Sequence, residues 1–135
     1  MDSIFLDANV LFSAAYRSDA GLRKLWRLPG VRKITSAYAL EEARRNLSNV
    51  WQRRELDELL RSVEIVPTAA PTDHPLFSSV VELPDKDRPV LLAASGVGTT
   101  HLLTGDFRPF GPLYGESIEG VLILAPRKHL SLRPS

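Results

Sequence analysis

The stretch IFLDANVLFSA, residues 4–14, decides how this chain is expected to fold. Its first three apolar residues run directly into Asp7, and a second apolar run begins at Val10. A short apolar run without polar alternation predicts a strand that is buried on both faces, as in central strands of parallel sheets. In open α/β sheets, ligands and chemistry collect just beyond the carboxyl ends of the strands. We therefore expect Asp7 at such a position, while a turn residue at Asp7 and a helix cap at Asn9 are the ordinary alternatives.

Length and composition fit one ordinary globular domain. The chain has 135 residues, of which 44% are hydrophobic and 24% charged, so we expect a single domain over residues 1–135. No apolar run approaches the ~20 residues of a membrane span, and acidic residues interrupt the N-terminus where a signal peptide would be apolar. With no cysteine, disulfides and thiolate chemistry are excluded. A cytoplasmic location without membrane partners is the resulting expectation.

The net charge of +1 is unevenly distributed. Residues 17–61 hold eleven basic side chains against six acidic ones, whereas residues 1–16 and 62–135 each carry a net charge of −2. A basic middle segment between two acidic segments is the charge pattern expected of a protein that binds a polyanion beside a carboxylate cluster. Arg-rich helices are also commonly just solvated, so this pattern alone does not distinguish the two interpretations.

Strand-like and helix-like segments alternate along the chain. Strands are expected at 4–6, 31–35, 63–66, 101–104 and 121–124, the last ended by Pro126. Helices are expected from Asn9 to Tyr16, around 22–26, from an N-cap at Ser36 through Leu40, Ala43, Leu47 and Val50, through 56–60, and from Asp87 to Gly96 or Gly98. Residues 67–86 are proline-rich and predict a loop with one short helix near 77–81, and residues 107–119 predict a second loop. This alternation predicts an α/β fold, a three-layer α/β/α sandwich with a central parallel sheet of four to five strands.

Several acidic residues fall where this map places the carboxyl edge of the sheet or the start of a helix. Asp7 ends the first strand and Asp106 the fourth. Asp87 opens the long helix on its apolar stripe, although Asp85 suits the helix start equally well. In the middle helix the candidate is Glu41 or Glu42, and periodicity does not decide between them.

Carboxylates that converge on one sheet edge need compensation for their charge. Buried like charges repel one another, so a cation or protons must hold them together. A ligand set of oxygens alone favours Mg²⁺ or Mn²⁺. Singly, however, each of these acids also has an ordinary role as a cap, a turn residue or an exposed partner of a basic side chain.

Other kinds of active site find little support in the sequence. His74 falls in the proline-rich loop, His101 begins a strand and His129 belongs to the basic tail, so no competing histidine site is expected. Nucleophile-elbow, phosphate-loop and dinucleotide fingerprints are absent, and GVGTT after the long helix is interpreted as a helix terminator.

At this point the sequence resembles a PIN domain, the nuclease fold of many prokaryotic toxin–antitoxin toxins. Four segments carry the resemblance in the order of the family: FLDANVLFSA at 5–14, TSAYALEEARRNL at 35–47, DKDRPVLLAASGVGTTHLLTGD at 85–106, and VLILAPRKHL at 121–130. The third is the most specific, because an acid opens a helix that leads through a strand into Thr-Gly-Asp. The proline-rich segment 67–86 matches nothing in the family pattern.

The resemblance assigns roles to individual residues. It implies that the acidic quartet of the family falls on Asp7, Glu42, Asp87 and Asp106, as catalytic residues and metal ligands. Glu42 is preferred to Glu41 by its interval to Leu47, and Asp87 to Asp85 by its intervals to Val90 and Ala94. Asn9 and Thr104 match polar positions that support the metal site.

The implied function is that of a Mg²⁺- or Mn²⁺-dependent endoribonuclease, the toxin of a toxin–antitoxin pair. In-line attack with departure of the 3′ oxygen is what the family implies. RNA would be the substrate, a cognate antitoxin a partner, and a homodimer a further expectation to which Trp51 or Leu56 could contribute. Candidates for contacts to RNA phosphates are the arginines of the basic middle: Arg44, Arg45, Arg53 and Arg54.

Two rival functions follow from the same residues. A degenerate PIN domain would bind RNA or protein without cutting. A haloacid-dehalogenase-like phosphatase also begins with a strand and Asp, and has a late Gly-Asp. Here, however, Asn9 replaces the second acid of its first motif, and Phe110 stands where its late motif requires another acid.

Overall fold

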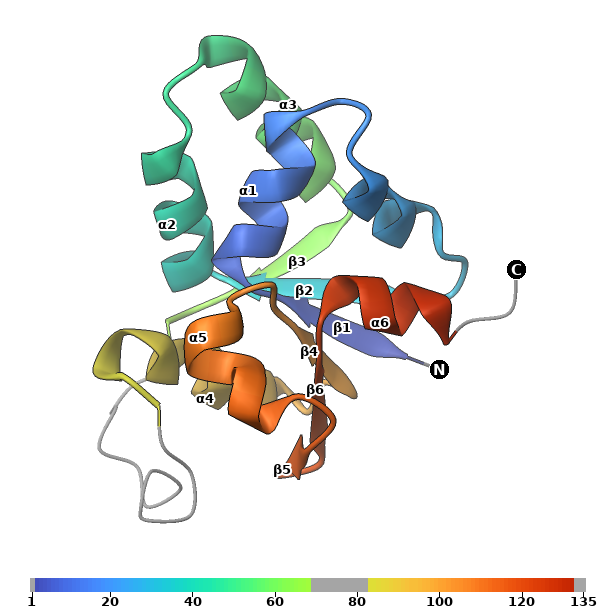
Figure 1. Cartoon of the computed structure of the whole chain (residues 1–135). Helices are drawn as coiled ribbons and strands as arrows, with labels where there is room; N and C mark the ends of the chain where they lie inside the picture. Colours follow the sequence, from blue (N-terminus) through green and yellow to red (C-terminus); the bar gives the residue numbers. More distant parts are fainter. Residues whose placement is uncertain (1, 69–82, 133–135) are drawn as a thin grey trace.

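A six-stranded sheet forms the centre of the protein (Figure 1), seen in a computed structural model that describes residues 2–68 and 83–132. The strands are β1 (Ser3–Leu6), β2 (Arg32–Ser36), β3 (Val63–Val66), β4 (His101–Leu103), β5 (Ser117–Ile118) and β6 (Val121–Leu124). Their order in the sheet is β3-β2-β1-β4-β6-β5, and every pairing is parallel except that of β5 with β6.

Helices cover both faces of this sheet. One face carries α1 (Ala8–Tyr16), the 3-10 helix η1 (Gly21–Arg27), α2 (Ala37–Asn46), α3 (Val50–Leu60) and α6 (Pro126–Ser131). The other carries η2 (Asp85–Asp87), α4 (Arg88–Val97), α5 (Phe107–Phe110) and η3 (Gly111–Leu113). The three-layer α/β fold expected from the sequence is therefore confirmed. The sheet differs from the expected four to five parallel strands, because it has a sixth strand, β5, which is antiparallel to β6.

Strand β1 is buried along its whole length because both faces of the sheet are covered. Ile4 and Leu6 pack into the apolar cluster under α1, α2 and α3, whereas Phe5 packs into the cluster under α4. All three side chains are fully buried. The unbroken apolar run at the start of the sequence is thus explained by a strand with two cores, one on each side.

The strands that follow β1 in sequence are added first on one side of β1 and then on the other. From β1 the chain passes through α1 to β2 and through α2 and α3 to β3, whereas α4 leads into β4 on the opposite side of β1. The carboxyl ends of β1 and β4 therefore flank the point at which the strand order reverses. In doubly wound sheets this is the usual position of a ligand site.

Some elements differ from the expectation. The middle helix was predicted to include Val50, but α2 ends at Asn46, and α3 begins after Asn49, whose side chain accepts a hydrogen bond from the Trp51 amide. Leu56 is fully buried and belongs to the core, whereas Trp51 is exposed, so only Trp51 is available to a partner.

The C-terminal part is more regular than the sequence indicated. Residues 107–119, predicted as a loop, contain α5, η3 and the two-residue strand β5. Pro126 was expected only to end a strand, but it is the first residue of α6, where a missing N–H costs nothing. The helix predicted near 77–81 lies outside the described residues.

Within residues 2–68 and 83–132, no helix combines the length and hydrophobicity that a bilayer crossing requires.

Two glycines near the end of α4 test where this helix ends. Gly98 closes this helix with φ of 76°, a left-handed conformation that residues with a side chain rarely adopt. Gly96, in contrast, lies inside the helix. A Cβ added at either position would meet no atom within 4 Å. We expect Gly98→Ala to lower the free energy of unfolding by about 1 kcal/mol or more and Gly96→Ala to raise it by roughly 0.5–1 kcal/mol. Urea denaturation measures both, and equal effects of the same sign would contradict this assignment of the helix end.

Candidate active site

A cavity of about 380 Å³ opens at the carboxyl ends of β1 and β4, and four acidic side chains line it. Asp7 follows β1, Glu42 lies on α2, Asp87 ends η2, and Asp106 follows β4. Residues separated by up to 99 positions in sequence are thereby brought to one place. The remaining lining residues are Ala8, Asn9, Phe12, Asn46 and Lys86.

Asp7 is held by hydrogen bonds from three directions. Its Oδ1 accepts from the Ala8 amide at 2.7 Å, which also caps α1. Its Oδ2 accepts from the Thr104 hydroxyl at 2.7 Å and from the Asn9 side-chain amide at 3.3 Å. The helix-cap role and the proposed site role are therefore compatible in one residue, because the carboxylate has more acceptor positions than the cap uses.

Thr104 joins the ends of the two central strands. Its hydroxyl gives its proton to Asp7 and accepts from the Asn9 side chain at 3.3 Å and from the Asp106 amide at 3.1 Å. Because a hydroxyl has one proton and two lone pairs, all of its bonding capacity is used. Asn9 is fixed in turn by the Gly105 amide, which donates to Asn9 Oδ1 at 2.7 Å. A Cβ at Gly105 would lie 3.3 Å from that oxygen, which explains the glycine in Thr-Gly-Asp.

Burial dominates the electrostatics of Asp7. Its side chain is withdrawn from water, and desolvation raises the pKa from 3.8 to about 6. Hydrogen bonds from Thr104 and Ala8 act in the opposite direction, while the charges of Glu42 and Asp87 raise the pKa further. The protein thus holds an acid in a position that disfavours its negative charge unless a cation or proton is present.

Asp87 does not play the ordinary role of its position. It stands at the start of α4, yet its side chain makes no capping hydrogen bond. Its Oδ2 is buried and has no hydrogen-bond partner among the described residues. Burial raises the pKa of Asp87, Lys86 opposes this, and Asp106 and Glu42 add to the rise. A buried carboxylate oxygen without a donor is the kind of group that a metal ion would satisfy.

Two tyrosines lie at the margin of this charge cluster. The Tyr38 hydroxyl donates to the Lys86 carbonyl at 2.5 Å, and the Tyr114 hydroxyl donates to the Thr104 carbonyl at 2.7 Å. Burial raises the pKa of both phenols; Glu42 contributes for Tyr38 and Asp106 for Tyr114. Both therefore remain protonated donors that fasten the segments beside the acids.

The structure distinguishes the neighbouring acids that spacing left equivalent. Glu42 lines the acidic cavity, whereas Glu41 is exposed and lines a different depression. Asp87 lines the cavity, whereas the Asp85 side chain is 85% exposed and pairs with Arg88 at 3.0 Å. Each pair consequently supplies a candidate and a matched control only one or two positions away.

The donor set fits a hard divalent cation. Four carboxylates can provide oxygen ligands of the kind that Mg²⁺ and Mn²⁺ prefer. The raised pKa of Asp7 and of Asp87 shows that neither carboxylate has enough compensating positive charge. In the described residues, no three of these four acids bring their carboxylate oxygens within 4.8 Å of one another. One ion could be bound by three of these side chains only if they moved closer together.

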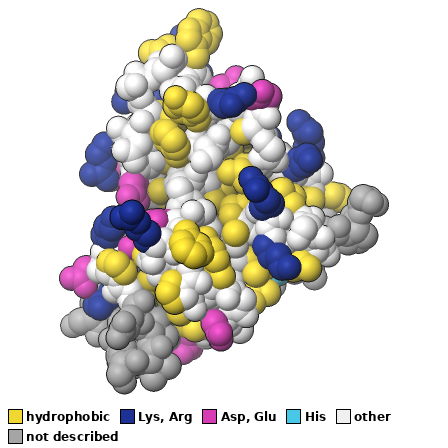
Figure 2. Space-filling view, viewed as in Figure 1, with side chains coloured by type: hydrophobic (Ala, Val, Ile, Leu, Met, Phe, Trp, Pro, Cys, Tyr) yellow, Lys and Arg dark blue, Asp and Glu magenta, His cyan; other side chains and the backbone are white. Residues whose placement is uncertain are grey.

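The four arginines considered for RNA contacts lie to one side of this cavity. Arg44, Arg45 and Arg53 line a separate depression with Glu41 and Asp57. Arg44 pairs with Asp57 at 3.1 Å, and Arg54 lies over the Trp51 ring at 5.2 Å from its centre. Figure 2 shows Lys and Arg side chains along this side of the molecule, around α2.

A second group of polar residues was missed by the sequence analysis. Asp2, His101 and His129 come together, with one potential ligand atom from each within 4.8 Å of the others. The sequence analysis expected no histidine site, because it did not predict α6, the helix that carries His129. Proline often begins a helix, so Pro126 followed by RKHL was the sequence signal that could have predicted α6. His74 lies outside the described residues.

The raised pKa of Asp7 makes a prediction about stability when divalent ions are chelated. Since the folded-state pKa of about 6 exceeds the ordinary 3.8, protonated Asp7 stabilises the fold below about pH 4, and this contribution is lost as the pH rises through 6. Relative to Asp7→Asn, which cannot ionise, the wild-type protein should lose roughly 2–3 kcal/mol of unfolding free energy between about pH 4 and pH 7.

Urea denaturation of both proteins in EDTA at several pH values measures this difference. Asp7→Asn disturbs the hydrogen bond from Thr104 at every pH, so the change with pH rather than the absolute difference is the relevant quantity. Parallel pH dependences of the two proteins would contradict the assignment.

No protein-family model matches the sequence, and no curated protein sequence is similar enough to count as a relative. The fold, in contrast, matches solved structures. VapBC2 from Rickettsia felis, solved bound to a DNA fragment from their promoter, is 15% identical with a TM-score of 0.67, covering 91% of this chain and 98% of that one. A toxin–antitoxin complex from Klebsiella pneumoniae is 18% identical with a TM-score of 0.64, covering 91% and 97%.

A third similar structure is VapC20 of Mycobacterium tuberculosis, a sarcin–ricin loop cleaving toxin. It is 16% identical with a TM-score of 0.56, and the match covers 77% of this chain and 92% of that one. The chain described here therefore has the fold of the PIN-domain toxins.

Proposed function

We propose that this protein is a divalent-metal-dependent endoribonuclease that hydrolyses RNA phosphodiester bonds. The observation that carries the proposal is the set of four carboxylates, from four separate segments, that line one cavity at the strand-order reversal of a PIN fold. A sarcin–ricin loop cleaving toxin is among the proteins that share this fold.

In this proposal Asp7, Glu42, Asp87 and Asp106 hold Mg²⁺ or Mn²⁺. A divalent ion bound there supplies Lewis acidity, which lowers the pKa of a coordinated water and offsets charge on the scissile phosphate. Asp7 keeps its carboxylate in one orientation because Thr104 and Asn9 both donate to Oδ2. These two residues therefore act by positioning Asp7.

Hydrolysis adds water across the bond between phosphorus and the 3′ oxygen. The water oxygen bonds to phosphorus in line with the bond that breaks, and the departing 3′ oxygen takes up a proton. Lys86 lines the same cavity, and its positive charge favours binding of the phosphate beside the acids.

Arginines of α2 and α3 are proposed to bind the RNA backbone. The charge of Arg45 acts on Tyr38 at the margin of the cavity. Arg44 and Arg53 line a depression together with Arg45, and Arg54 lies over the Trp51 ring. Contacts of this kind position an RNA without reading its sequence.

The phosphatase alternative finds no support in the site. Asn9 is engaged by Asp7, Thr104 and Gly105, and is no second acid. Phe110, at the place where that family's late motif needs a carboxylate, is fully buried in the core beneath α4.

We further propose that the nuclease is the toxin of a toxin–antitoxin pair in a cell interior. Two of the proteins with this fold were solved as toxin–antitoxin complexes or with promoter DNA. An antitoxin that covers the cavity would bring positive charge toward the four acids, because these dominate its lining.

Paired substitutions test the site. In Mg²⁺ or Mn²⁺ we expect Glu42→Gln and Asp87→Asn to lower the rate of single-stranded RNA cleavage by about 10²-fold or more, because each removes a ligand charge. Glu41→Gln and Asp85→Asn, which change acids outside the cavity, should cut at nearly the wild-type rate. Initial rates on a labelled RNA measure all four variants, and EDTA should abolish cleavage.

Circular dichroism melts control for folding in this series. Undiminished cleavage by Glu42→Gln or Asp7→Asn would rule out the proposed site. RNA binding by the wild-type protein without metal-dependent turnover would instead identify a degenerate binding domain.

Growth of a bacterial host tests the toxin assignment. Induced expression of the wild-type chain should arrest growth, and Asp7→Asn expressed at the same level should not, since it lacks cleavage activity. Co-expression of a small DNA-binding protein from the adjacent reading frame should restore growth. Equal arrest by both chains would show that toxicity does not depend on the acidic site.

A further inference from the structure

A second cluster of metal-binding side chains lies at the opposite edge of the sheet from the acidic cavity. Asp2 directly precedes β1, His101 is the first residue of β4, and His129 is on α6. One nitrogen or oxygen from each lies within 4.8 Å of the other two. Figure 1 shows the start of β1 beside α6, so segments from the two ends of the chain meet there.

The register of the sheet explains this meeting. His101 pairs with Ile4 on one side and Leu122 on the other, and residues paired in this way direct their side chains to the same face of a sheet. Ile4 and Leu122 pack into the cluster on the face that carries α6. The His101 ring consequently meets the His129 ring, with centroids 4.9 Å apart and planes inclined at 73°.

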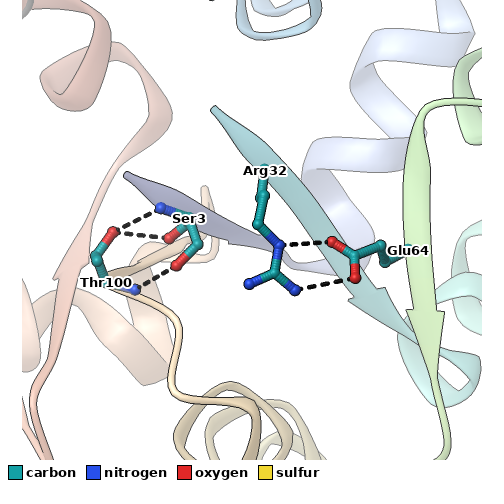
Figure 3. A network of polar contacts seen from close by, with 4 residues as sticks. All are labelled: Ser3, Arg32, Glu64 and Thr100. Atoms are coloured by element: carbon teal, nitrogen blue, oxygen red, sulfur yellow. Dashed lines mark hydrogen bonds and ion pairs between the residues drawn. The ribbon is translucent and has the colours of Figure 1, made fainter. Parts of the chain in front are cut away.

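Thr100 determines the tautomer of His101. The Thr100 hydroxyl lies 2.8 Å from the Ser3 carbonyl oxygen, to which it must donate because a carbonyl has no proton (Figure 3). It also accepts from the Ser3 amide at 2.9 Å. His101 Nδ1 lies 2.7 Å from the same hydroxyl, whose single proton is already committed, so Nδ1–H must be the donor.

In the neutral ring this tautomer leaves the lone pair on Nε2 of His101. Histidine ligands of metals commonly donate their other N–H to an oxygen in this manner, which fixes both the tautomer and the ring orientation. A metal ion bound by His101 with this hydrogen bond intact would therefore take Nε2 as its ligand.

The separation of His129 and Asp2 suits a tetrahedral ion. His129 Nε2 lies 3.5 Å from Asp2 Oδ2, and two ligands at ~2.0–2.1 Å from a tetrahedral zinc ion are about 3.3–3.4 Å apart. The His129 side chain is 3% exposed and that of Asp2 34%, so the ring is held by packing while the carboxylate faces solvent. Three protein ligands with one side open to water describe a common zinc geometry.

We propose that Asp2, His101 and His129 bind a divalent transition-metal ion of the zinc type, which links the start of β1, β4 and α6. Two imidazoles and one carboxylate favour Zn²⁺ or Co²⁺ over Mg²⁺, which prefers oxygen ligands. This site is independent of the proposed nuclease centre, because the two lie at opposite ends of β1 and β4 and share no residue.

Cobalt titration of the full chain tests the proposal. Tetrahedral Co²⁺ gives visible absorption bands that octahedral Co²⁺ on oxygen ligands does not, so the two sites can be distinguished in one protein. We expect one equivalent of such bands in the wild type, displaced by Zn²⁺ and unaffected by excess Mg²⁺. Asp2→Asn and His101→Gln should weaken the binding at least tenfold.

Matched variants separate this site from its surroundings. Asp7→Asn alters the acidic cavity and should leave the bands unchanged. Thr100→Ser keeps the hydroxyl and should bind cobalt as the wild type does, whereas Thr100→Val should bind about 10–100-fold more weakly. Asp2→Asn is the principal variant, because the Asp2 carboxylate is partly exposed and Asn has the same shape as Asp. Circular dichroism checks the fold of each protein.

Two results would overturn the proposal. One is a wild-type protein without tetrahedral cobalt bands, in which case Asp2 and His129 form an ion pair only. The other is cobalt binding of equal strength in the wild type, Asp2→Asn and His101→Gln. Neither result would bear on the acidic cavity, whose activity is measured separately.

Discussion

The hydrogen bond from the Thr104 hydroxyl to Asp7 is the interaction on which the candidate active site depends. It joins the ends of β1 and β4 at 2.7 Å, and the same oxygen accepts from Asn9 and from the Asp106 amide. The side chain of one acid and the backbone of another are therefore held to a single atom. This connection stabilises an arrangement that desolvation and like charge would otherwise oppose.

Much of this architecture could be predicted from local patterns. Unbroken apolar runs identified the central strands, because burial on both faces removes the alternation of exposed strands. Acids that directly follow such runs were placed at the correct edge for a simple reason, namely that parallel strands end together. What periodicity could not resolve was the choice between adjacent acids. Glu41 and Glu42 flank the same apolar stripe, and only the packing of α2 places Glu42 on the cavity.

The features that escaped prediction are short or depend on distant residues. Strand β5 has two residues and α6 has six, so neither is long enough to show a period. The cluster of Asp2, His101 and His129 requires the first strand, the fourth and the last helix to be in place. No spacing within the sequence encodes such a meeting, and only the tertiary structure brings these residues together.

The two ends of β1 offer opposite coordination chemistry. Four carboxylates gather at its carboxyl end, whereas two imidazoles join one carboxylate at its amino end. The four residues of β1 separate these environments by about 13 Å at ~3.3 Å per residue. The two proposed sites would therefore bind hard and borderline cations without competition, since each presents donors that the other ion binds less well.

The margins of the sheet limit how the protein can associate. On one side β5 folds back on β6 through a two-residue turn, Glu119-Gly120, in which both residues have positive φ. On the other, Glu64 of β3 is bound by Arg32 of β2 with two contacts of 2.9 Å (Figure 3). Short strands and charged side chains at open edges discourage pairing between molecules. These features disfavour strand-by-strand polymerisation of the sheet.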